Sequence, residues 1–179
     1  LGDVYKRQSI SEGFLNVGYY SRANSLLIIG TVIASSVGPL LYSKWSLVKG
    51  KELKLQVRRV SLLLAFVNTL LAIGLIIFAP IFIRILYGTE YQTAAPVLRL
   101  LALTMIANGA KEVSYGILSS QGSPLSIMKN LVIGIILSAI LNYFIIPQFG
   151  VIGCSVVTVL VTFTTAFLLP VSYTHLTLP

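Results

Sequence analysis

Five long runs of apolar residues divide the chain, and short polar connections separate them. A helix needs about 20 predominantly apolar residues to cross a bilayer core of about 30 Å, and each run has roughly that length. The strand alternation and turn spacing typical of an outer-membrane barrel are not visible in the sequence. The pattern predicts an all-α fold, a polytopic membrane helix bundle with about five transmembrane helices. The predicted spans are residues 24–43, 60–83, 96–119, 127–147 and 150–170.

Basic residues concentrate in the longest connection, residues 44–59, which holds six of them against one acidic residue. Basic loops stay on the cytoplasmic side of a membrane, so we predict this connection to lie inside. Alternation of the spans then puts the connections at residues 84–95 and 148–149 outside. Leucine and valine interleave loosely with the charges of residues 44–59, which allows a short amphipathic surface helix within that connection.

The composition agrees with a membrane protein, because 56% of the 179 residues are hydrophobic and 10% are charged, against about 25% charged in soluble domains. The net charge is +8. The basic residues lie between apolar runs and form no patch on a soluble domain, so we expect no nucleic-acid partner. The single cysteine, Cys154, lies inside an apolar run, and the sequence holds no metal-ligand cluster, P-loop or nucleophile elbow. We therefore expect no catalytic residue, no metal and no cofactor.

The two ends break the surrounding pattern. The first eight residues, LGDVYKRQ, and the last nine, VSYTHLTLP, resemble translated sequencing-adapter read-through, so residues 1–8 and 171–179 are predicted to be non-native and to pack poorly. Residues 9–170 then form one transmembrane domain. The chain has no initiator methionine, and residues 13–20 lie outside by alternation. We expect a preceding span in the intact protein, which would give a unit of six helices.

Three ionisable residues lie within a predicted span: Arg99, Lys111 and Glu112. Such a group costs about 2.5–3.5 kcal/mol at the centre of a membrane helix. Arg99 is near the outer end of its span and can reach the headgroups along its own apolar stem. Lys111 and Glu112 lie deeper and need another explanation.

Polar residues at helical spacing accompany Lys111 on one face. Thr104, Asn108, Lys111 and Tyr115 are spaced by 4, 3 and 4 residues, and Glu112 lies at the edge of this stripe. A polar stripe in a membrane helix should face a bundle interior or a water-filled cavity. One interpretation is a substrate pathway that attracts anions, with these residues lining it. The other is a structural ion pair, or a lysine that reaches the cytoplasmic surface.

Small and hydroxylated residues form weaker stripes on the last two predicted spans. Such faces usually serve helix packing in membranes, and lining of a pathway is the alternative. Pro80 can in addition bend the second span, since proline interrupts helical hydrogen bonding. The residues of the two stripes are Gly134 with Ser138, and Ser155, Thr158, Thr162 and Thr165.

Four segments, in this order and on these predicted helices, resemble the C-terminal half of the polysaccharide flippases, which are members of the multidrug/oligosaccharidyl-lipid/polysaccharide exporter superfamily. The resemblance covers roughly residues 13–170. The segments are VGYYSRA at 17–23, ILYGTEYQTAAPVLRLLAL at 85–103, ILSSQG at 117–122 and LNYFIIPQFGVIGCSVVT at 141–158.

The resemblance implies a MATE-like transporter of twelve spans in two six-helix lobes, of which this chain would match spans eight to twelve. It further implies alternating access, a lipid-linked saccharide as substrate, a bacterial inner membrane, and contact with membrane lipids and with an N-terminal lobe. Cationic cavity residues are expected to face the anionic headgroup, and Arg22 and Lys111 are the candidates here. Alternatives are a multidrug cation exporter of the same superfamily, which would favour cavity carboxylates, and a membrane-embedded glycan polymerase or acyltransferase.

Overall fold

The computed structural model describes residues 2–36, 45, 47–48, 50–120 and 124–177. The side chains of residues 2–12 and 170–177 are not among those described. The predicted poor packing of residues 1–8 and 171–179 therefore lies outside the described part of the chain.

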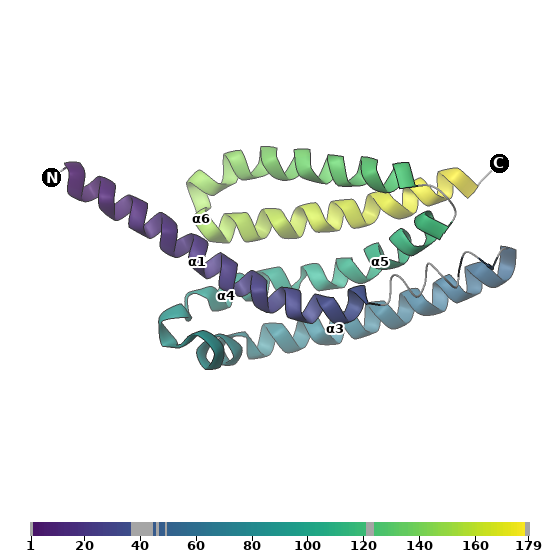
Figure 1. Cartoon of the computed structure of the whole chain (residues 1–179), viewed down its shortest axis with the longest axis horizontal. Coiled ribbons are helices and arrows are strands. Elements are labelled where there is room, and N and C mark those ends of the chain that lie inside the picture. Colours follow the sequence, from purple (N-terminus) through teal and green to yellow (C-terminus); the bar gives the residue numbers. More distant parts are fainter. Residues whose placement is uncertain (1, 37–44, 46, 49, 121–123, 178–179) are drawn as a thin grey trace.

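Helices account for nearly all of the described chain (Figure 1). No strand occurs among the described residues, so the predicted all-α helix bundle is confirmed. The elements in order are α1 (Gly2–Ser35), α3 (Gly50–Tyr87), the 3₁₀ turn η1 (Thr89–Tyr91), α4 (Ala94–Ala102), α5 (Thr104–Ser120) and α6 (Pro124–Thr177).

Helix α6 is two helices joined by a sharp reversal at Gly150, and Figure 1 shows it doubling back on itself. Gly150 has φ 55° and ψ −137°, a backbone region that is accessible in practice only to glycine. Gly153 then packs closely on the half of α6 that precedes the turn, since a Cβ there would lie 2.8 Å from the Cβ of Phe149. The sequence predicted a tight turn one to two residues earlier, at 148–149.

The helices run back and forth along one axis, so their ends gather at two poles of the bundle (Figure 1). The turns at Gly88 and Gly150 lie at one pole. The start of α3, the end of α5 and the C-terminal end of α6 lie toward the other. The chain thus alternates in direction as the span prediction requires. Which pole faces the cytoplasm stays a prediction from the charge bias.

Two segments differ from the simple pattern of one helix per apolar run. Residues 50–59, predicted as part of a connection, form the first turns of α3, where the buried Leu53 packs with Trp45 and Val113. The run at 96–119 is interrupted at Leu103, whose N–H bonds to the carbonyl of Leu100 at 3.1 Å, so α4 and α5 are separate helices. Both features reflect packing between helices, and a hydropathy pattern contains no information about that packing.

The short helix α4 lies at the centre of the larger core. Its Val97, Leu98 and Leu101 are fully buried, and they pack with apolar residues of α1 and α3. Ala23 of α1 and Ala79 of α3 belong to the same cluster. These small side chains let the helix backbones approach closely, which is how membrane helices gain packing energy.

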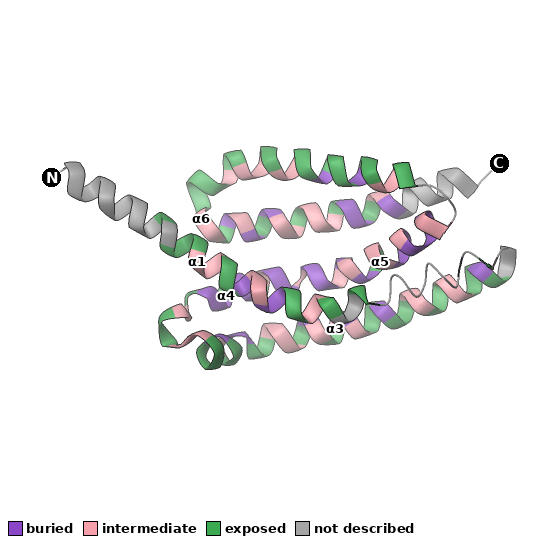
Figure 2. Cartoon of the chain, viewed as in Figure 1, coloured by how far each residue is buried: buried purple, intermediate pink, exposed green. Residues whose placement is uncertain are grey.

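The outer faces of α3 and of the first half of α6 are apolar and exposed (Figure 2). Phe66 is 61% exposed and Ile135 is 68% exposed. Among the described residues, two helices are long and apolar enough to cross a membrane, Glu52–Tyr87 and Pro124–Leu169. Large apolar surfaces of this kind would be unfavourable in water and are suited to lipid.

Candidate functional site

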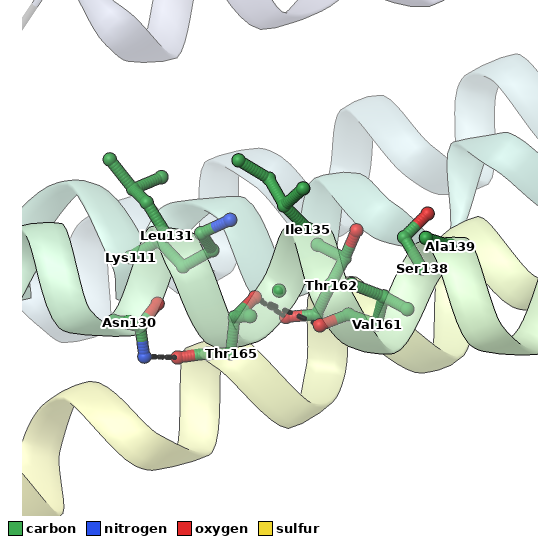
Figure 3. A pocket seen from close by; sticks show the side chains of 10 residues that line it. Lys111, Asn130, Leu131, Ile135, Ser138, Ala139, Val161, Thr162 and Thr165 are labelled. Atoms are coloured by element: carbon green, nitrogen blue, oxygen red, sulfur yellow. Dashed lines mark hydrogen bonds between the residues drawn. The ribbon is translucent and has the colours of Figure 1, made fainter.

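Lys111 projects from α5 into an open cavity of about 430 Å³ between α5 and the two halves of α6. Figure 3 shows its ammonium group beside the side chains of Leu131 and Ile135. The cavity combines one cation with amide and hydroxyl groups on an apolar background. Its lining residues are Lys111, Asn130, Leu131, Gly134, Ile135, Ser138, Ala139, Val161, Thr162 and Thr165.

The wall opposite Lys111 is built where the two halves of α6 touch. Asn130 Nδ2 donates a hydrogen bond of 3.0 Å to the carbonyl of Thr165, 35 residues away (Figure 3). Gly134 makes the approach possible, because a Cβ there would lie only 2.9 Å from Thr165 Cγ2. Gly134 therefore serves helix packing, the commoner use of a small residue on a membrane helix.

The hydroxyl groups of this wall already donate to their own helix. Thr165 Oγ1 donates to the carbonyl of Val161 at 2.9 Å, and Thr162 Oγ1 donates to that of Thr158 at 2.7 Å. A hydroxyl that donates once still has lone pairs to accept with. The Oδ1 of Asn130 is buried and has no hydrogen-bond partner among the described residues. The wall therefore offers acceptors, and Lys111 offers a charged donor.

The predicted stripe on α5 is only partly brought together. Lys111 Nζ lies 6.0 Å from the centroid of the Tyr115 ring, within reach of a cation–π contact. Thr104 is 2% exposed, and its hydroxyl donates to the carbonyl of Leu101 at 2.6 Å, which supports the start of α5. Asn108 and Glu112 are half-buried but do not line the cavity. Lys111 is thus the stripe residue that the cavity contains.

Arg22 lies elsewhere, where α1 meets the turn after α3. Its guanidinium carbon is 5.3 Å from the centroid of Tyr87 and 6.0 Å from that of Tyr91. Tyr19 stacks edge-on against Tyr91 at 5.9 Å. An exposed arginine among tyrosines, here beside the end of α3, is typical of a membrane interface. Arg22 does not line the Lys111 cavity, so the two predicted cations do not share that site.

Asn130 was missed by the sequence reasoning, although a signal was present. It stands four residues before Gly134 and eight before Ser138, so all three share one helix face. Extending the Gly134–Ser138 pair back by one turn would have found it. Thr162 and Thr165 of the weaker stripe do line the cavity, whereas Ser155 is fully buried and bonds to the carbonyl of Val151.

These features define an all-helical membrane protein with a largely apolar cavity that contains one lysine between its apolar helices. The chain belongs to the MatE family, which matches residues 20–144. Members of this family are membrane transporters within an exporter superfamily.

A relative of known sequence supports the membrane assignment. The chain is 31% identical over 145 residues to "Uncharacterized membrane protein MJ1068" of Methanocaldococcus jannaschii, an alignment that covers 79% of this chain. The aligned part spans 29% of the relative's length. No solved structure matches the chain at a significant level.

Proposed function

We propose that this chain is part of a transporter that flips lipid-linked oligosaccharide or polysaccharide repeat units across a bacterial inner membrane by alternating access. The observation that supports the proposal is the charge of the cavity. Of the described residues that line it, one is a cation, Lys111, and none is a carboxylate. A phosphate-bearing headgroup carries the charge that such a cavity would attract.

The energetics of Lys111 point the same way. A lysine at the centre of a membrane helix costs about 2.5–3.5 kcal/mol unless water, an anion or other polar groups compensate it. Glu112 follows it directly in sequence, but adjacent residues point about 100° apart around a helix and do not face each other. An anionic headgroup that enters the cavity would offset the cost of burying the charge of Lys111. Without such a headgroup that cost remains, so the charge favours the bound state.

The proposal includes the surroundings of the chain. Its substrate would be the lipid-linked saccharide. Membrane lipids would surround the chain, and an N-terminal lobe would complete the cavity. The rival within the same superfamily is export of cationic drugs. A cation exporter would need a carboxylate in the cavity, and Glu112, the carboxylate nearest in sequence to Lys111, does not line it.

Glycan export by the full-length transporter in a flippase-deficient strain tests the proposal. Lys111→Ala should reduce export about 10- to 100-fold, because a hydrogen bond to a charged group contributes about 1.5–3 kcal/mol. Lys111→Arg should retain part of the activity, since it keeps the charge. Lys129→Ala is the matched control, because Lys129 is an exposed lysine of the same bundle that does not line the cavity.

Protein abundance in isolated membranes must be measured for each variant, so that lost insertion is not read as lost transport. Full glycan export by Lys111→Ala at normal abundance would refute the proposed role. Loss of drug-cation export in Glu112→Gln, with glycan export unaffected in all variants, would favour the rival function.

A further inference from the structure

Proline 80 interrupts the hydrogen bonding of the longest apolar helix outside α6. It lies inside α3, with seven further helical residues after it. Proline has no backbone N–H, so the carbonyl four residues earlier, that of Ile76, loses its helical donor. An unpaired carbonyl is expensive at membrane depth, where no water can replace the missing bond.

Two side chains from the segment after α3 donate to this part of the helix. Arg99 Nε donates to the carbonyl of Ile76 at 3.1 Å, across 23 residues of sequence. Gln92 Nε2 donates to the carbonyl of Pro80 at 3.2 Å. Residues 76 and 80 are one helical turn apart, so both acceptors lie on one face of α3.

We propose that Arg99 is a positioning residue that supplies the hydrogen bond missing at Pro80. Together with Gln92 it forms a clasp, defined as these two side chains and the two carbonyls they meet. The clasp holds the segment from η1 to α4 against α3. The sequence predicted that Arg99 reaches the headgroups; the residue is exposed, and its Nε is directed at the helix backbone.

The clasp has a mechanical consequence for α3. Opening an ordinary helical turn breaks a bond between two backbone groups. At Pro80 the corresponding bond is made by a side chain of another helix. The end of α3 can therefore bend when the hydrogen bond from Arg99 to Ile76 breaks. Prolines in membrane helices are tolerated because neighbouring groups re-satisfy the freed carbonyl, and here the neighbour is identified. The inference does not depend on which substrate the transporter carries.

A double-mutant cycle followed by amide hydrogen exchange tests the clasp in the full-length protein in nanodiscs. Arg99→Met keeps the apolar stem and removes the donor. It should speed exchange in peptides that cover residues 76–87 by about 5- to 10-fold, since a lost hydrogen bond of about 1–1.4 kcal/mol permits that much more local opening. Arg84→Met removes an exposed arginine from the same helix and should leave exchange unchanged.

Pro80→Ala supplies the decisive background, because alanine at residue 80 has the backbone N–H that can donate to the carbonyl of Ile76. In that background Arg99→Met should change exchange by less than about 2-fold, since the carbonyl again has a helical partner. An equal effect of Arg99→Met in both backgrounds would overturn the clasp, as would no effect in either. A substrate-binding arginine would not be rescued by replacing a proline in another helix.

The test survives poor folding of the single variant. If Arg99→Met does not accumulate in membranes, the double variant with Pro80→Ala should restore its abundance. Failure of the double variant to accumulate, when Pro80→Ala alone does, would also refute the clasp.

Discussion

Adding one methyl group at Gly153 should destabilise the protein, whereas adding one at Gly74 should not. A Cβ at Gly153 would lie 2.7 Å from Ile145 Cγ2 and 2.8 Å from Phe149 Cβ. The Phe149 atom is fixed by its own backbone, so the two halves of α6 would have to shift at their turn. A Cβ at Gly74 of α3 would meet nothing within 4 Å.

The magnitudes follow from two opposing terms. Alanine is favoured over glycine in a helix interior by up to about 1 kcal/mol, and overpacking a close contact costs about 1–3 kcal/mol. Gly153 is in the first turn after the reversal, where the helix-propensity gain is smallest. Gly153→Ala should therefore lower the free energy of unfolding by about 1–2 kcal/mol, and Gly74→Ala should raise it by about 0.5–1 kcal/mol.

The two variants can be compared by SDS titration of the protein in mixed micelles, with unfolding followed by far-ultraviolet circular dichroism. Gly153→Ala should unfold at a lower SDS fraction than the wild type, and Gly74→Ala at an equal or higher one. The same unfolding midpoint for both variants would mean that the turn of α6 accommodates a side chain. The close packing of its two halves would then have no energetic role.

Two further outcomes follow from the fold. Tyr20→Phe should destabilise the protein by about 0.6 kcal/mol in the same titration, the average for interhelical hydrogen bonds in membranes. It removes the 3.2 Å bond between Tyr20 and Thr158 that joins α1 to α6. An unchanged midpoint would mean that this bond does not contribute to stability. In a Cys154→Ser background, Glu52→Cys should be labelled by an impermeant thiol reagent only from the cytoplasm, and labelling from the outer side would reverse the predicted orientation.

The lengths and spacing of the apolar runs were sufficient to predict the helix bundle, its alternating direction and the position of the last turn to within two residues. These features depend on hydropathy and on glycine, which are properties of the sequence itself. The break at Leu103 does not depend on hydropathy or on glycine, because leucine favours a helix and Leu103 keeps helical dihedral angles. The interruption comes from how α4 packs into the core, which is a tertiary effect.

The three ionisable residues within one predicted span show why a site is harder to predict than a fold. By sequence, Arg99 is explained by its place near the outer end of the span, and Lys111 and Glu112 are equally unexpected in a membrane helix. In the structure Arg99 bonds to the backbone of α3, Lys111 lines a cavity, and Glu112 is half-buried away from that cavity. The Arg99 bond spans 23 residues of sequence, and the Lys111 cavity is completed by residues of α6, so no local pattern could have separated the three residues.

The shape of the Lys111 cavity adds an argument about what kind of anion it would suit under the proposed function. Its rim carries exposed apolar side chains, including Leu131 and Ile135, which continue the apolar outer face of α6. Its wall carries the Thr162 hydroxyl and the Asn130 amide. A free polar sugar would have to lose its water against the leucine and isoleucine side chains, which offer no hydrogen bonds in return. A lipid-linked anion could keep its hydrocarbon chain along the apolar rim while its headgroup meets Lys111, so neither part would be exposed to the wrong solvent.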